Sequence, residues 1–189
     1  YGGGMSNDNA ASTVTDCTFS GNSVNGGGLG GGGMFISQSS PTVSNCVFSD
    51  NSASDGGGMY NWLNSSPTVG NCTFSNNPAT SGGGILCRNS SSPTITDCTI
   101  SGNTASWSGG GIECDYSSSA TIKNCIVSDN SSNYGGGMQF NQSAPVVINC
   151  IIGNNTSSNG GAGINNDDAS STFINCTISG NNGPGGGLH

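Results

Sequence analysis

Five side chains that follow the glycine-rich segments of this chain are of types that bind sugars. They are the aromatic residues Tyr60 and Trp62, the cation Arg88, and the carboxylates Glu113 and Asp115. Aromatic faces pack against sugar rings, and charged groups exchange hydrogen bonds with hydroxyls. If inward and outward positions alternate, all five lie on the outer face of one sheet. The set predicts either a glycan-binding strip or a solvated face, where an arginine–carboxylate pair stabilises little.

The other carboxylates do not form a catalytic or metal-binding pattern. Proteins that cleave polysaccharides use clustered carboxylates, often with Ca²⁺ and a basic side chain. Asp50, Asp129, Asp167 and Asp168 offer oxygen ligands for Ca²⁺, but they do not recur from repeat to repeat. We therefore expect no catalytic residue, no metal and no cofactor.

Nine cysteines raise the question of thiol chemistry. Seven of them recur at intervals of 25 to 29 residues: Cys17, Cys46, Cys72, Cys98, Cys125, Cys150 and Cys176. We expect this cysteine ladder to point inward as small buried hydrophobes, because stacked Cβ atoms lie ~4.8 Å apart and a disulfide needs ~3.8 Å. Cys87 and Cys114 hold equivalent positions in consecutive repeats and are the best candidates for one disulfide.

An asparagine stands five residues after every ladder cysteine. This column is Asn22, Asn51, Asn77, Asn103, Asn130, Asn155 and Asn181. A carboxamide has both donors and an acceptor, so amides stacked at the spacing of β-strands can bond to the amides above and below. We predict a continuous asparagine ladder.

The apolar residues identify the elements that must carry these columns. One stands three positions before each ladder cysteine and another two positions after it, as Val43 and Phe48 do around Cys46. Glycine runs closed by Met, Ile or Leu recur with the same period, and no helical periodicity appears. A repeat of this length indicates a solenoid. We predict an all-β fold, a right-handed parallel β-helix with three sheets and about seven coils of ~26 residues, as a single domain over residues 1–189.

Composition excludes two classes of partner. The chain has two basic and ten acidic residues and a net charge of −8, whereas nucleic-acid binding requires clustered cations. No segment approaches the ~20 consecutive apolar residues of a membrane-spanning helix. Only 31% of the residues are hydrophobic, which suits a solenoid, because each coil buries its face on the next one.

Two short motifs recur together in the repeats. One is Gly-Gly-Gly-Met/Ile, and the other is Phe-Ser-x-Asn, which occurs at residues 19–22, 48–51 and 74–77. They are similar to the repeats of polymorphic outer-membrane proteins, the β-helical passenger regions of bacterial surface adhesins, and the chain resembles the wider pectate-lyase-like superfamily. From the fourth repeat onward Ile or Val replaces Phe, and a third glycine stands where the adhesin motif usually has alanine. The resemblance implies an extracellular or cell-surface location, a role in adhesion or scaffolding, and cell-surface glycans as partners. It carries over no catalytic residue.

These features predict an extracellular structural or adhesive rod without enzymatic activity. Both ends of the sequence carry the same first-strand motif and neither carries a cap. We therefore expect either a part of a longer solenoid or a unit that stacks end to end with copies of itself into a filament.

Two alternatives stay open. One is a carbohydrate-binding or carbohydrate-cleaving β-helix. The other is an ice-binding protein, because threonines occupy outward strand positions in most repeats, as in Thr94-x-Thr96. Lys123, Ile126 and Ile151 interrupt these arrays, and threonine is also an ordinary residue of exposed strands. Thermal hysteresis separates ice binding from adhesion.

Overall fold

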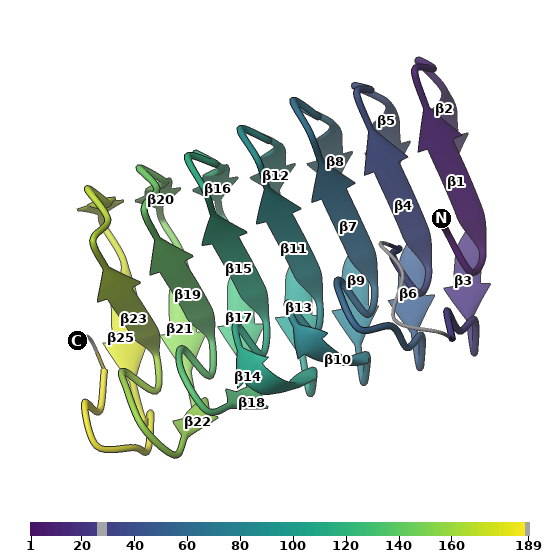
Figure 1. Cartoon of the computed structure of the whole chain (residues 1–189). Coiled ribbons are helices and arrows are strands. Elements are labelled where there is room, and N and C mark those ends of the chain that lie inside the picture. Colours follow the sequence, from purple (N-terminus) through teal and green to yellow (C-terminus); the bar gives the residue numbers. More distant parts are fainter. Residues whose placement is uncertain (26–29, 188–189) are drawn as a thin grey trace.

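The computed structural model describes residues 1–25 and 30–187. Within these ranges the chain forms strands and turns, and no helix long and apolar enough to cross a membrane occurs there. The chain winds into a right-handed parallel β-helix of about seven coils, which stack in sequence order from one end of the molecule to the other (Figure 1). The β-helix predicted from the repeats is therefore confirmed.

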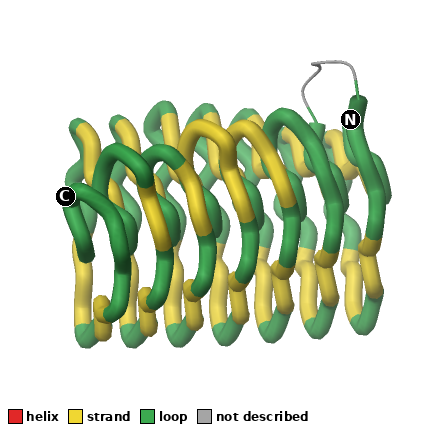
Figure 2. The backbone as a smooth tube through the Cα atoms, turned by 90° about the horizontal axis from the view of Figure 1, so that it is seen from below, coloured by secondary structure: helices red, strands yellow, loops and turns green. Residues whose placement is uncertain are grey.

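Three seven-stranded parallel sheets form the faces of the β-helix (Figures 1 and 2). The first contains β1 (Met5–Asp8), β4 (Met34–Ser37), β7 (Met59–Trp62), β11 (Ile85–Arg88), β15 (Ile112–Asp115), β19 (Met138–Asn141) and β23 (Ile164–Asp167). The second contains β2 (Thr13–Thr15), β5 (Thr42–Ser44), β8 (Thr68–Gly70), β12 (Thr94–Thr96), β16 (Thr121–Lys123), β20 (Val146–Ile148) and β24 (Thr172–Ile174). The third contains β3 (Thr18–Ser20), β6 (Val47–Ser49), β9 (Thr73–Ser75), β13 (Thr99–Ser101), β17 (Ile126–Ser128), β21 (Ile151–Gly153) and β25 (Thr177–Ser179).

A fourth sheet lies between the third sheet and the first, and the repeat pattern did not predict it. Its four strands are β10 (Pro78–Ser81), β14 (Thr104–Ser108), β18 (Ser131–Ser132) and β22 (Thr156–Ser157). They run along the lower edge of the first sheet in Figure 1. A register shift between Ala79 and Ser81 interrupts the pairing of β10 with β14, so this sheet is less regular than the other three.

Left-handed backbone makes two corners of every coil. The residue before each ladder cysteine has a φ between 52° and 55°; these residues are Asp16, Asn45, Asn71, Asp97, Asn124, Asn149 and Asn175. The residue before each ladder asparagine also has a positive φ; these are Gly21, Asp50, Asn76, Gly102, Asp129, Asn154 and Gly180. Glycine, Asn and Asp adopt this conformation at least cost, which explains why only these three residue types occupy both columns.

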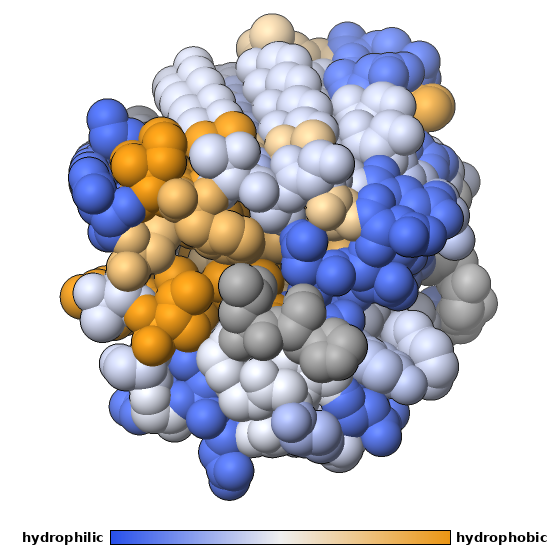
Figure 3. Space-filling model, turned by 90° about the vertical axis from the view of Figure 1, so that its left-hand side faces the viewer, coloured by the Kyte–Doolittle hydropathy of each residue, from blue (hydrophilic) through white to orange (hydrophobic). Residues whose placement is uncertain are grey.

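The interior consists of stacked side chains of the same type. Phe19, Phe48 and Phe74 lie with ring centroids 4.8 and 4.7 Å apart and with planes 3° from parallel. This distance is close to the spacing of neighbouring strands, because in-register pairing places each ring directly on the next. Viewed from the last coil, apolar side chains gather inside a hydrophilic rim (Figure 3). Phe173 and Ile178 of that coil are partly exposed and pack against the same core.

The asparagines form the continuous ladder expected from their spacing. Six side-chain hydrogen bonds join Asn22, Asn51, Asn77, Asn103, Asn130, Asn155 and Asn181 in order. Nδ2 of Asn77, for example, donates to Oδ1 of Asn103 at 2.8 Å and to the carbonyl oxygen of Phe48 at 3.0 Å. Oδ1 of Asn77 accepts from the backbone N–H and from Nδ2 of Asn51. Each amide between the two ends of the ladder therefore joins the coils on both sides of it.

Candidate functional site

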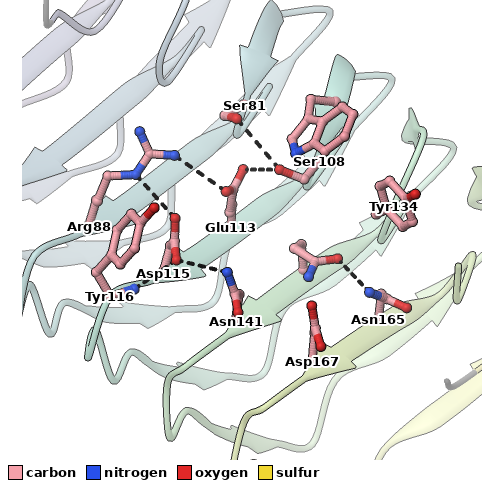
Figure 4. Close-up of a pocket in the computed structure, with 12 residues that line it drawn as sticks. Ser81, Arg88, Ser108, Glu113, Asp115, Tyr116, Tyr134, Asn141, Asn165 and Asp167 are labelled. Carbon is pink, nitrogen blue, oxygen red and sulfur yellow. Dashed lines mark hydrogen bonds and ion pairs between the residues drawn. The ribbon is translucent and has the colours of Figure 1, made fainter.

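A groove lies on the outer face of the first sheet, above β15, β19 and β23 (Figure 4). It encloses about 450 Å³. Its lining residues are Ser81, Arg88, Trp107, Ser108, Glu113, Asp115, Tyr116, Tyr134, Gln139, Asn141, Asn165 and Asp167. A second hollow shares Tyr134, Asn165 and Asp167 with the first and extends to Pro184 and Gly185. The two hollows therefore form one elongated depression along the β-helix.

The floor of the groove is polar, because the outward residues of three neighbouring strands are all hydrophilic. They form two columns, Glu113–Gln139–Asn165 and Asp115–Asn141–Asp167. Nδ2 of Asn165 donates to Oε1 of Gln139 at 2.9 Å, and Nδ2 of Asn141 donates to Oδ1 of Asp115 at 3.2 Å. Strand spacing makes this floor repeat every ~4.8 Å along the axis.

Arg88 of β11 closes one end of the groove. Its guanidinium lies 3.3 Å from Oδ1 of Asp55, 3.6 Å from Oε1 of Glu113 and 3.3 Å from Oδ2 of Asp115. Its carbon Cζ also lies 5.8 Å from the centroid of the Tyr116 ring, within cation–π distance. Burial by itself would lower the pKa of Arg88, but the carboxylates, that of Glu113 first, raise it above its ordinary value. Three carboxylates and one aromatic ring therefore surround the Arg88 guanidinium.

Two of the three carboxyl groups beside Arg88, those of Glu113 and Asp115, have a raised pKa. Glu113 is 3% exposed, and its burial raises its pKa to about 7, although Arg88 and the Ser108 hydroxyl, which donates to Oε2 at 2.8 Å, act in the opposite direction. Burial also raises the pKa of Asp115. The backbone N–H of Tyr116 and Nδ2 of Asn141 donate to Oδ1 of Asp115, while Arg88 holds Oδ2. Protein groups therefore engage all four oxygens of this pair.

Aromatic residues form the walls of the groove. Trp107 of β14 is 57% exposed and meets Tyr134 edge to face, with ring centroids 5.5 Å apart. Tyr116, at the turn after β15, is 52% exposed. Figure 4 shows Tyr116 and Tyr134 on opposite sides of the polar floor. The groove thus combines apolar ring faces with hydrogen-bonding groups between them.

The structure brings together three of the five residues predicted as a glycan-binding strip. Arg88, Glu113 and Asp115 line the groove, whereas Tyr60 and Trp62 do not. The expectation that Tyr60 faces solvent is wrong: it is fully buried, because Phe35, Leu86 and Trp62 pack around it on the outer face of the sheet. Glu113 and Asp115 are also buried, so this face is not the solvated surface considered as the alternative.

The sequence interpretation missed the residues that make this face a groove. Trp107 and Tyr134 both stand within two residues of a glycine run in consecutive repeats, and Tyr116 directly follows β15. Gln139 and Asn165 continue the Glu113 column in register. The available signal was an aromatic residue just before the glycine run in two consecutive repeats, but the sequence pattern did not predict the fourth sheet, which places Trp107 on the groove.

The cysteine ladder lies in the core, with Cys46, Cys72, Cys98, Cys125 and Cys150 buried, Cys176 half-buried and Cys17 exposed. Each buried thiol donates to the carbonyl oxygen two residues before it, as Cys46 Sγ does to Ser44 at 3.1 Å. Burial raises the pKa of Cys46, which keeps the thiol protonated. These contacts fit the expected role of small core residues.

Cys87 and Cys114 are register partners on β11 and β15, and both are fully buried. Both are free thiols in the structure, and the disulfide between them stays a prediction.

Thiol counting tests this account of the cysteines. In denaturant, a chain without disulfides should expose nine reactive thiols, and a chain with the Cys87–Cys114 bridge should expose seven. In the folded protein we expect rapid labelling at Cys17, because it is the one fully exposed thiol in residues 1–25 and 30–187. Fewer than seven thiols in denaturant would mean that ladder cysteines are oxidised, which contradicts their role as core thiols.

The threonine arrays lie on the outer faces of the second and third sheets. Thr94 pairs with Thr68 and Thr121 in register, so the columns are continuous in the middle of the molecule. Ile126, Ile151 and Ile174 are exposed in or beside these columns and break their regularity. Among the described residues, no group of three or more Asp, Glu, Cys or His side chains is arranged to hold a metal ion.

The structure is a β-helix with a groove on the outer face of its first sheet. Residues 2–149 match the family model described as right handed beta helix region, which covers more than half of the chain. The chain therefore belongs to this family of right-handed β-helices. No curated protein and no solved structure matches it. The family includes both enzymes and non-enzymes, so membership assigns the fold and not the activity.

Proposed function

We propose that this chain is a rigid rod of an extracellular or cell-surface protein, and that its lateral groove binds a saccharide without cleaving it. The observation that carries the proposal is the groove itself, with a polar floor between exposed aromatic walls. Concave sites with ring faces and a few placed polar groups are typical of small-molecule and oligosaccharide binding.

The groove matches the two surfaces of a sugar chain. Hydroxyls can exchange hydrogen bonds with the amides of Gln139 and Asn141 and with the carboxylate of Asp167, while the C–H faces of the rings pack on Trp107 and Tyr134. The floor repeats at the strand spacing of ~4.8 Å, close to the length of one pyranose in an extended chain. An extended oligosaccharide lying along the axis would therefore meet similar groups at successive units.

The geometry of the carboxylates favours binding over catalysis. A general acid or base must reach the scissile bond, but Arg88, Ser108, Asn141 and the backbone N–H of Tyr116 already hold the oxygens of Glu113 and Asp115. The extracellular location rests on the resemblance of the repeats to surface adhesins, in which such a groove would serve as the adhesive site.

Calorimetric titration with a panel of neutral, acidic and basic oligosaccharides tests this function. We expect binding that Trp107→Ala weakens by about tenfold, because the variant removes an exposed ring wall. Ile151→Ala, an exposed apolar residue on the third sheet, is the matched control and should leave the affinity unchanged. Absence of binding to every oligosaccharide, or equal affinity of the Trp107→Ala protein, would rule out the groove as a saccharide site.

A further inference from the structure

The charges around the groove are unbalanced. One guanidinium, that of Arg88, faces the four carboxyl groups of Asp55, Glu113, Asp115 and Asp167. Arg88 lies at one end and contacts the first three of them. Asp167 lies on β23, three strands beyond Arg88, where no described side chain pairs with its exposed carboxylate. The negative charge therefore extends beyond the reach of Arg88, the one cation among the described residues that line the groove.

An unpaired donor in the floor points independently to a ligand. Gln139 is 5% exposed and lines the groove, and its Oε1 accepts from Asn165 at 2.9 Å. Its Nε2 has no acceptor among the residues that the structure describes and stays accessible from the groove. An acceptor such as a ligand hydroxyl would satisfy it.

We propose that the groove selects a positively charged saccharide, an oligomer of amino sugars with free amines, with one amine beside Asp167 and a hydroxyl on Gln139. This inference rests on the proposed saccharide-binding function and specifies the ligand. The excess of carboxylates repels the uronic acids of acidic polysaccharides and attracts protonated amines. The exposed ring of Trp107 and the half-buried ring of Tyr134 favour the same charge, because the faces of aromatic rings attract cations.

The affinities of three tetrasaccharides test the charge preference of the groove. They are a tetrasaccharide of glucosamine, its fully N-acetylated counterpart, and a tetrasaccharide of galacturonic acid. At a pH where the amines are protonated, we expect the glucosamine oligomer to bind at least about fivefold more tightly than the acetylated one, with an advantage that declines as salt is added. The galacturonate oligomer should bind most weakly.

Asp167→Asn keeps the size of the side chain and removes its charge. It should reduce the affinity for the glucosamine oligomer by about fivefold and that for the acetylated oligomer much less, because the amide that replaces the carboxylate can still bond to a hydroxyl. Asp50→Asn removes the same charge at an exposed turn outside the groove and is the matched control.

The outcomes separate the two proposals. If the acetylated oligomer binds as tightly as the amine, or if Asp167→Asn has no effect on a protein that binds sugars, the charge preference is wrong and the saccharide function stands. If no oligosaccharide binds but oligolysine does, both proposals fail, and the groove is a site for basic peptides.

Discussion

Replacing Gly84 by alanine should lower the free energy of unfolding by about 4 kcal/mol, because the substitution forces two coils apart. A Cβ atom at this position would lie 2.5 Å from the carbonyl oxygen of Gly111 and 3.2 Å from Nδ2 of Asn103. The Gly111 carbonyl accepts the backbone hydrogen bond of Ile85, so it cannot move without breaking the pairing of β11 with β15. Urea denaturation of the purified protein measures the change.

Gly70→Ala is the matched control, since it adds the same methyl group in the same β-helix. The nearest atom to its Cβ would be Oγ1 of Thr96 at 3.5 Å, an ordinary contact distance. We expect no loss of stability, or a gain of up to ~1 kcal/mol from the lower entropy of the unfolded chain. Equal losses of unfolding free energy after the Gly84 and Gly70 substitutions would show that the glycine runs are not needed for close packing between coils.

Asn103→Ala should destabilise the protein by about 3 kcal/mol, because it removes four hydrogen bonds from the middle of the ladder. Oδ1 of Asn103 accepts from the backbone N–H and from Nδ2 of Asn77, and its Nδ2 donates to the Phe74 carbonyl and to Oδ1 of Asn130. The site is fully buried, so water cannot replace these partners. Urea denaturation of the Asn103→Ala protein measures this loss of stability.

Asn22→Ala provides the comparison within the ladder. The side chain of Asn22 makes one ladder bond, from Nδ2 to Oδ1 of Asn51 at 2.9 Å, and it lies in a partly exposed environment. We expect a cost of ~1 kcal/mol. If Asn22→Ala and Asn103→Ala shift the denaturation midpoint equally, the stability does not come from stacked amides.

Most of the fold could be predicted from the sequence, because in-register stacking converts a sequence column directly into a spatial column. Val43, Cys46, Phe48 and Asn51 each repeat at fixed offsets, and the structure places each of these columns inside the β-helix. Their identities follow from physical requirements that every coil shares. Repetition therefore reports architecture with little ambiguity.

The fourth sheet and the groove walls could not be predicted in the same way. The segment between each ladder asparagine and the next glycine run varies in length and composition, from Pro78–Ser81 in β10 to Ser131–Ser132 in β18. The strands of the fourth sheet lack the alternation of apolar and polar residues by which a strand is recognised in a sequence. Trp107 is placed in the groove by this irregular segment, and no column in the sequence indicates its orientation.

The alternation of inward and outward residues also did not predict how far the outward side chains are exposed to solvent. Alternation correctly assigns Tyr60 and Glu113 to the outer face of the first sheet, but it does not show what packs on that face. Tyr60 is buried by outward neighbours on adjacent strands, and Glu113 lies beneath the groove wall that contains Ser108. A buried glutamate with a pKa near 7 therefore arose at a position that the alternation assigned to solvent.

Tryptophan fluorescence tests whether the groove binds saccharides, because the chain has two tryptophans and only Trp107 lines the groove. The Trp62→Phe variant leaves Trp107 as the only reporter, and the Trp107→Phe variant leaves Trp62. Titration with the glucosamine tetrasaccharide should produce a saturable change in the fluorescence of the Trp62→Phe protein and none in that of the Trp107→Phe protein. A saturable change from Trp62 alone, or no change from either protein, would contradict the claim that the groove binds sugar.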